Sequence, residues 1–139
     1  MNADEKKKTA FEFVLKSEAN DRAAIERLIS DDFICEIMEV DAAWQLGDKT
    51  MGGTMTRDQY LDYGMPAMKQ LFKDGMRFTC ELAICDGPHV VILGRSEATA
   101  NNGNKYNNLY SWYFRFSGDT ICLIREYRDT HHSRVVIGF

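Results

Sequence analysis

Apolar residues recur with a helical period in the first part of the chain. Over residues 3–19 they return every three or four positions among lysines and glutamates, which predicts an amphipathic helix. A second helix is expected directly after it, with Asn20 or Asp21 as its N-cap. Residues 33–40 then form a mostly apolar run that indicates a strand, in which Glu36 is either an edge charge or a buried carboxylate.

The middle of the chain changes from an irregular segment to a third helix. Residues 41–55 contain three glycines and follow neither period, which predicts a loop. Thr56 and Gln59 have the spacing of a capping box, and they are expected to begin the third helix. Pro66 falls inside that helix and predicts a kink or a division into two short helices.

Strand patterns follow one another in the second half of the chain, with turn sequences between them. Strands are expected at residues 77–85, 89–100, 106–116 and 121–129, and a tail at 131–139. Helices that precede a run of hairpin-joined strands predict an α+β domain, with the helices packed on one face of an antiparallel sheet. If the sheet is strongly curved, a pocket is left between it and the helices. The whole chain, residues 1–139, is expected to form one such domain.

The last two predicted strands each have one face on which apolar and polar side chains mix. The first of these faces carries Tyr106, Asn108, Tyr110, Trp112, Phe114 and Phe116. The second carries Ile121, Leu123, Arg125, Tyr127 and Asp129. Side chains alternate across a strand, so each set is expected on one side of the sheet. Apolar walls with a few polar groups are typical of a ligand pocket, and a core face with a polar rim is the alternative.

Two acidic side chains and one arginine are the candidates for chemistry. Arg95 and Glu97 lie two residues apart on one predicted strand face, either as an exposed charge pair or as a polar patch in the pocket. In the pocket they could meet Asp129 at the end of its own strand. An arginine between two carboxylates in a low dielectric would separate the pKa values of the two acids and provide an acid and a base.

Composition and charge exclude several classes of partner. Apolar residues make up 45% of the 139 residues. The net charge is −4, and acidic and basic residues are scattered along the chain. No nucleic-acid partner is expected, because such a surface needs a clustered basic patch. No run approaches the roughly 20 apolar residues that span a bilayer, so no membrane partner is expected. The amino-terminal segment is too polar for a signal peptide, so a cytoplasmic location is expected.

No motif in the sequence suggests a metal or another cofactor. The four cysteines form no CxxC pair, and they are expected to be reduced core residues: Cys35, Cys80, Cys85 and Cys122. His131 and His132 would point to opposite faces of a strand, which argues against a two-histidine metal site. The sequence has no zinc-protease motif, phosphate-binding glycine loop or nucleophile elbow.

Three segments, residues 52–61, 102–110 and 125–132, are similar to the NTF2-like superfamily and, within it, to SnoaL-like and ketosteroid-isomerase-related proteins. This resemblance implies a cone-shaped α+β fold with a deep apolar pocket, and a homodimer formed through the sheet. It also implies positions for catalytic groups. The matches to the arginine and two aspartates of limonene-epoxide hydrolases are Arg95, Glu97 and Asp129, and Glu97 departs from the aspartate of that pattern. A steroid-isomerase base would fall on Glu36 or Glu39, and a SnoaL-like cyclase base on Asp129.

These observations together predict a cofactor-free enzyme with an apolar pocket. The expected reaction is general acid/base isomerisation or cyclisation of a hydrophobic metabolite that contains a carbonyl, with Asp129 as base and Arg95 and Glu97 in support. The expected substrate-binding residues are Trp44, Asn108, Tyr110, Trp112, Phe114 and Tyr127, of which Trp44 either plugs the core or forms the lip of the cavity. The alternatives are an epoxide hydrolase of the limonene-epoxide type, and a ligand-binding or dimerisation module without turnover.

Overall fold

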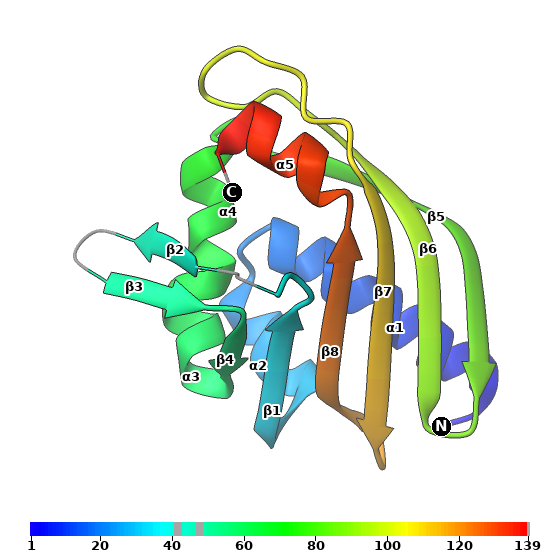
Figure 1. Cartoon of the computed structure of the whole chain (residues 1–139). Coiled ribbons are helices and arrows are strands. Elements are labelled where there is room, and N and C mark those ends of the chain that lie inside the picture. The colour runs from blue at the N-terminus through cyan, green and yellow to red at the C-terminus, as the bar shows by residue number, and fades with distance from the viewer. Residues whose placement is uncertain (41–42, 47–48, 139) are drawn as a thin grey trace.

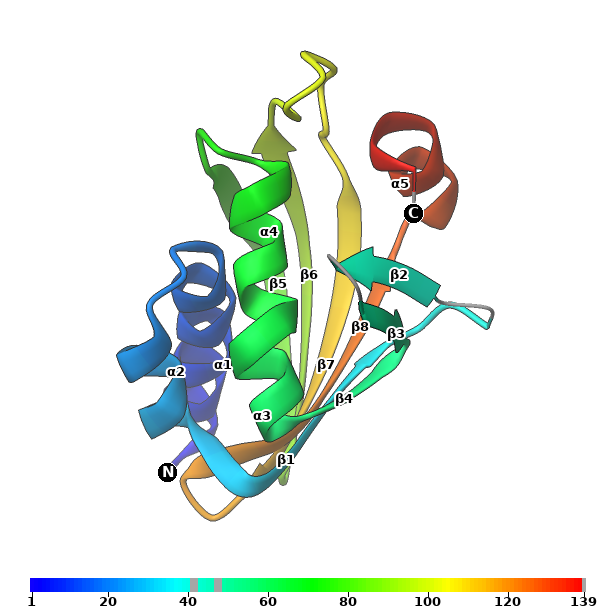
Figure 2. The same ribbon diagram turned by 90° about the vertical axis from the view of Figure 1, so that its left-hand side faces the viewer.

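Helices cover one face of a six-stranded sheet in the computed structural model of the chain (Figure 1). The structure describes residues 1–40, 43–46 and 49–138, with the backbone alone at 43–46 and 49–51. Its helices are α1 (Ala3–Glu18), α2 (Arg22–Leu28), α3 (Arg57–Gln59), the π-helical turn η1 (Tyr60–Gly64), α4 (Met65–Leu71) and α5 (Thr130–Ile137). Figure 2 shows α1, α2 and α4 on one side of the sheet. None of the described helices has the length and apolar character needed to cross a bilayer.

The helices begin at the capping residues that the sequence offers. Asp21 accepts a hydrogen bond from the Ala24 backbone and caps α2, as one of the two predicted candidates. Thr56 and Gln59 form the predicted capping box at the start of α3. The third predicted helix contains the π-helical turn η1, and Pro66 lies just after this turn, in the first turn of α4.

The large sheet is mixed, whereas an antiparallel sheet was expected. Its strand order is β4-β1-β8-β7-β6-β5. The strands are β1 (Ile29–Ile37), β4 (Thr54–Thr56), β5 (Met76–Asp86), β6 (His89–Ala98), β7 (Leu109–Ser117) and β8 (Thr120–Arg128). The strands from β5 to β8 follow one another in the chain and pair antiparallel, with two-residue turns between β5 and β6 and between β7 and β8 and a longer connection, residues 99–108, between β6 and β7. β1 pairs in parallel with β8, because the long stretch between them lets the chain return in the same direction.

Two regions differ from their predicted structure. The expected loop at 41–55 contains the hairpin β2 (Ala43–Leu46) and β3 (Lys49–Gly52), followed by β4. Strands of three or four residues are too short to show a period of two, so the sequence pattern could not indicate them. The expected tail contains α5, which begins at the N-cap Asp129.

A β-bulge in β8 changes which residues face the helices. Ile121 pairs with the core residue Phe116, but the next pair joins Leu123 to Arg115, so Cys122 is the extra residue. Beyond the bulge the alternation is reversed. Positions 124, 126 and 128 therefore face the helices, and positions 125 and 127 face outward.

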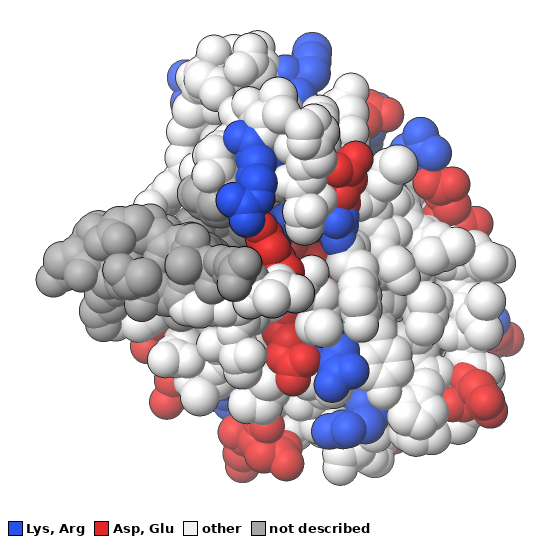
Figure 3. All heavy atoms as spheres, viewed as in Figure 1, with Lys and Arg blue, Asp and Glu red and all other residues white. Residues whose placement is uncertain are grey.

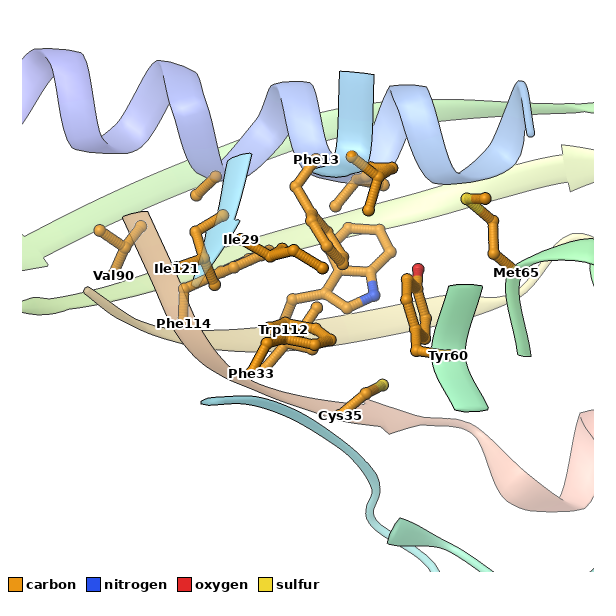
Figure 4. Close-up of a cluster of buried hydrophobic side chains, with 14 of the residues drawn as sticks. Phe13, Ile29, Phe33, Cys35, Tyr60, Met65, Val90, Trp112, Phe114 and Ile121 are labelled. Carbon is orange, nitrogen blue, oxygen red and sulfur yellow. The ribbon is translucent and has the colours of Figure 1, made fainter. Parts of the chain in front are cut away.

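The core is built around aromatic rings between α1 and the sheet. The Phe13 ring lies 5.8 Å from Phe33, 5.6 Å from Tyr60 and 5.8 Å from Phe114, measured between ring centroids. Figure 4 shows these rings converging, with the Trp112 indole among them. A smaller cluster, which includes Phe72, Tyr106 and Val136, lies under α5.

Candidate functional site

A cavity of about 100 Å³ lies between the helices and the inner face of the sheet. Its walls are largely apolar. The cavity is lined by Phe13, Val14, Ser17, Glu18, Cys35, Ile37, Met55, Tyr60, Gly64, Met65, Ala67, Met68, Leu71, Phe78, Tyr106, Tyr110, Trp112, Ile124, Glu126, Arg128 and Ile137. Of these lining residues, only Glu18, Glu126 and Arg128 carry charged side chains at neutral pH. An apolar cavity with few charged groups can orient a ligand by those groups alone.

The carboxylate of Glu126 is fixed at both of its oxygens. The indole Nε1 of Trp112 donates to Glu126 Oε1 at 3.1 Å, and Nη1 of Arg128 donates to Oε2 at 3.0 Å. Trp112 and Glu126 are direct cross-strand partners on β7 and β8, so the sheet register brings the two side chains together. The result is one oriented, charge-paired carboxylate at the wall of an apolar cavity.

Arg128 lies between two carboxylates. Besides Glu126, its Nη2 is 3.9 Å from Oε2 of Glu39, and Glu39 also pairs with Arg134 of α5. The exposed fractions are 14% for the Arg128 side chain, 23% for Glu126 and 12% for Glu39. Burial alone would lower the pKa of Arg128, but Glu126 and the nearby buried tyrosines outweigh burial and raise the pKa above its ordinary value. Arg128 therefore stays charged, and its buried Nε has no hydrogen-bond partner among the described residues.

Three other groups of the cavity wall, Tyr110, Tyr60 and Cys35, are held neutral by burial. Burial raises the pKa of the Tyr110 phenol and of the Tyr60 phenol well above their usual range. Burial also raises the pKa of the Cys35 thiol, so this cysteine is not a thiolate nucleophile near neutral pH. Tyr110 is thus available as a neutral hydrogen-bond donor, and its hydroxyl lies 3.2 Å from Ser96 Oγ.

A buried polar network connects the sheet to α5 at one end of the cavity. Nδ2 of Asn108 donates to the Tyr106 hydroxyl at 2.9 Å, to Ser133 Oγ at 3.0 Å and to the Asp129 carbonyl at 3.2 Å. Its Oδ1 accepts from the Leu109 backbone at 2.8 Å. Because both ends of this buried amide are satisfied within the protein, Asn108 fixes the position of α5.

Metal ligands do not gather in the described part of the chain. No group of three or more His, Cys, Asp or Glu side chains there has the arrangement that could hold a metal ion.

Comparisons with known proteins bear on the fold. No protein-family model and no curated protein matches the chain. An NTF2-like protein of unknown function from Burkholderia pseudomallei matches over 100% of both chains, with a TM-score of 0.71 and 16% identity. A protein with a ketosteroid isomerase-like fold from Catenulispora acidiphila, solved with trimethylamine, covers 94% of this chain and 92% of its own, with a TM-score of 0.73 and 14% identity.

The chain has the NTF2-like fold. TerC, co-crystallised with polyporic acid, has it as well: it covers 94% of this chain and 99% of its own, with a TM-score of 0.71 and 19% identity. The recognised resemblance and the expected cone of helices on a curved sheet are therefore confirmed. At identities of 14–19%, this similarity shows the fold alone. The chemistry has to be argued from the residues of the site.

The predicted catalytic residues do not lie together in this NTF2-like cone. Alternate residues of β6, such as Ile92 and Ser96, are buried on the inner face. Arg95 and Glu97 lie at the other positions of the strand and are therefore on the outer face. Nε of Arg95 donates to Glu81 at 2.8 Å, and Glu97 pairs with Arg77 across β5.

Asp129 also differs from its expected setting. Its carboxylate is at the N-cap of α5 and accepts from the His132 backbone at 3.0 Å. Between Asp129 and Arg95 lies Leu109 of β7, which pairs with Arg95 and accepts a backbone hydrogen bond from Asp129. The expected cluster of one arginine and two acids is therefore replaced by two outer ion pairs and one helix cap. Catalytic roles for these three residues remain predictions.

The predicted binding residues lie in different parts of the structure. Tyr110 and Trp112 line the cavity, and Phe114 is packed in the core beneath it. Asn108 is buried under α5 and does not line the cavity, while Tyr127 is on the outer face with 45% of its surface exposed. Trp44 belongs to β2, and its side chain is outside the described residues.

Glu126 and Arg128 were missed because the bulge in β8 reverses the alternation. Counted without a bulge from Ile121, both residues would face outward. One sequence signal could have indicated them, because Glu126 and Arg128 flank Tyr127 as a second acid–base pair two residues apart. Glu36, left open between an edge charge and a buried carboxylate, is half-buried on β1 and pairs with Arg125 at 2.9 Å.

Proposed function

We propose that this protein is a cofactor-free enzyme that removes a proton from a carbon next to a carbonyl in a compact, apolar substrate, leading to isomerisation or cyclisation. The observation that carries the proposal is the Glu126 carboxylate, which Trp112 and Arg128 hold at the wall of an apolar cavity. An oriented carboxylate in a low-dielectric site is suited to general base catalysis.

Each polar group has one role in the proposed reaction. Glu126 accepts the proton from the α-carbon, and the electron pair of the broken C–H bond moves toward the carbonyl oxygen to form an enolate. Arg128 stays charged and stabilises the negative oxygen, and the neutral phenol of Tyr110 is a second donor. In a substrate with a C=C bond next to the α-carbon the enolate is conjugated, and return of the proton from Glu126 to the far carbon of that bond moves the double bond without any co-reactant. The base and cation roles expected of Asp129 and Arg95 thus pass to Glu126 and Arg128.

Exchange of α-protons in heavy water tests this proposal directly. NMR would follow deuterium uptake by a panel of compact cyclic ketones and enones in the presence of the protein. We expect Glu126→Gln to lower the exchange rate by about 10²–10⁴-fold, the range associated with a lost general base. The matched control is Glu97→Gln, which neutralises an exposed glutamate on the outer face and should leave the rate unchanged. Equal rates in wild type and Glu126→Gln would contradict the role of Glu126.

Epoxide hydrolysis is a second candidate, favoured by the position of Arg128 between Glu126 and Glu39. Of two acids around one arginine, one can activate a water as a carboxylate while the other, protonated, gives its proton to the opening epoxide oxygen. Under this alternative, compact cyclic epoxides would give diols carrying one oxygen from isotope-labelled water, while the ketone panel would show no exchange. A ligand-binding role without turnover would give binding without either reaction.

We further propose that two copies of the chain associate through the outer face of the sheet. Large apolar side chains are exposed there, from 42% for Leu93 to 55% for Ile84: Leu82, Ile84, Leu93, Leu109 and Tyr127. Figure 3 shows this side of the molecule, where uncharged residues make up most of the surface over β6 and β7. An apolar patch of this kind is typical of a protein interface.

Sedimentation velocity would test the association. We expect twice the chain mass for wild type, and the mass of one chain for Leu93→Glu, which places a charge in the middle of the patch. Lys6→Glu on α1, away from the patch, is the control and should stay a dimer. A monomeric wild type would contradict the association.

A further inference from the structure

The turn η1 contains a glycine whose presence the backbone does not require. Gly64 lies in the right-handed helical region, with φ of −63° and ψ of −53°, so any residue could adopt its conformation. Glycine is also among the poorest helix formers. A glycine at this position therefore needs a reason other than backbone geometry.

The lack of space beside Met55 supplies that reason. A Cβ atom added at Gly64 would lie 2.6 Å from Met55 Sδ, 3.2 Å from Met55 Cε and 3.3 Å from Cδ2 of Tyr60. The first distance is shorter than any normal contact between such atoms, so Met55 would have to move. Met55 is 1% exposed, on β4, and all three residues line the cavity.

Movement of Met55 would change the volume of the cavity. The end of a methionine side chain has three rotatable bonds and adapts readily to its surroundings. The backbone of β4 is fixed by its pairing with β1, where Met55 is opposite Cys35. A displaced thioether therefore finds its free space mainly in the cavity that it already borders.

We infer that Gly64 is a specificity-determining residue: it gives room to the Met55 thioether, and the two residues together set the length of the ligand that fits. The inference rests on the proposed function only in taking this cavity as the substrate site. The cavity of about 100 Å³ is of the same order as the roughly 150 Å³ cavity known to bind benzene, so one small ring is the largest ligand that we expect it to take. The chemical class of substrate is thus a single-ring compound with one oxygen substituent, turned toward Glu126 and Arg128, and with little or no substituent on the side toward Met55.

A series of para-alkylphenols tests the length limit, since phenol presents one ring and one oxygen. Titration calorimetry would give the Kd of phenol and its 4-methyl, 4-ethyl and 4-propyl derivatives for wild type, Gly64→Ala, Met55→Ala and the double variant. We expect Gly64→Ala to shift the longest accepted chain down by one carbon, with a loss of about tenfold or more at that carbon, as is typical of one methylene in a tight pocket. Met55→Ala should allow a longer alkyl chain than the wild type accepts.

The double variant separates a specific contact from a general disturbance. In the Met55→Ala background the clash partner is absent, so Gly64→Ala should leave the length profile unchanged and, as a better helix former, should raise the Tm. Ile124→Ala is the matched control, because Ile124 lines the cavity from β8. In that background Gly64→Ala should keep its full effect. Circular dichroism would verify that each variant is folded.

The outcomes distinguish this inference from the proposed function. A length profile that Gly64→Ala does not change, or that it changes equally with and without Met55, overturns the role of Gly64 and leaves Glu126 as the base. Phenols that fail to bind wild type overturn both, since the cavity is then not the ligand site. A shifted profile in a protein that exchanges no α-protons supports the inference and overturns only the chemistry.

Discussion

β6 and β8 each carry an arginine and a glutamate two residues apart, and the two pairs have opposite environments. Arg95 and Glu97 of β6 are on the outer face, with 53% and 54% of their side chains exposed, and each pairs across to β5. Glu126 and Arg128 of β8 are on the inner face, with 23% and 14% exposed, and they pair with each other. The same residue types at the same spacing thus give a solvated pair in one strand and a cavity site in the other.

The difference is one of solvation and not of composition. An ion pair in water gains little, because water screens the charges and the long side chains lose freedom. A pair that is mostly buried has lost its hydration, so each charge depends on its partner. In the inner pair, Trp112 and Glu39 add further partners, so removal of one member leaves several groups unsatisfied.

The largest effect is expected from removal of the inner arginine. Arg128→Met keeps a side chain of similar length but leaves Glu126 and Glu39 without their shared cation. We expect a loss of about 3–5 kcal/mol in the free energy of unfolding, as is typical of a broken buried ion pair. The matched outer variant, Arg95→Met, should change the stability by no measurable amount. Urea denaturation of both variants at neutral pH would show a large difference between them, and equal losses would contradict the distinction between the two faces.

A smaller effect is expected at Asp129, where a capping role and a catalytic role predict different results. Asn is as good an N-cap as Asp, so Asp129→Asn should keep both the Tm and the α-proton exchange rate. Asp129→Ala removes the acceptor of the His132 N–H and should cost about 1 kcal/mol in stability, without a comparable loss of exchange. Loss of exchange in Asp129→Asn, with the fold intact, would restore Asp129 as the base.

Much of the fold could be predicted from the sequence because its signals are local. The capping box at Thr56 and Gln59, the amphipathic pattern over residues 3–19 and the hairpin turns each depend on neighbours in the chain. The parallel pairing of β1 with β8 could not be predicted in this way, since it depends on a contact between distant segments. The start of α5 had a local signal, but a capping aspartate and a catalytic aspartate at the end of a strand look the same in a sequence.

The structure brings part of the predicted site to the cavity, and a bulge in β8 accounts for the positions of Arg125 and Tyr127. Tyr110 and Trp112 were expected on a pocket wall and do line the cavity, because β7 alternates regularly over these residues. Across the bulge in β8 the alternation is reversed, so Arg125 and Tyr127 face outward in place of Glu126 and Arg128. A bulge depends on the register between strands, and that register is not written in either strand alone.

The central claim is that chemistry takes place at the inner pair and not at the outer one. A crystal structure of the protein soaked with cyclohexanone would test it most directly, because the electron density reports the position of the ring without assumptions about turnover. We expect the ring in the cavity, against Tyr110 and Trp112, with its oxygen within hydrogen-bond distance of Arg128. Density for the ring on the outer face, beside Arg95 and Asp129, with the cavity empty, would contradict the account.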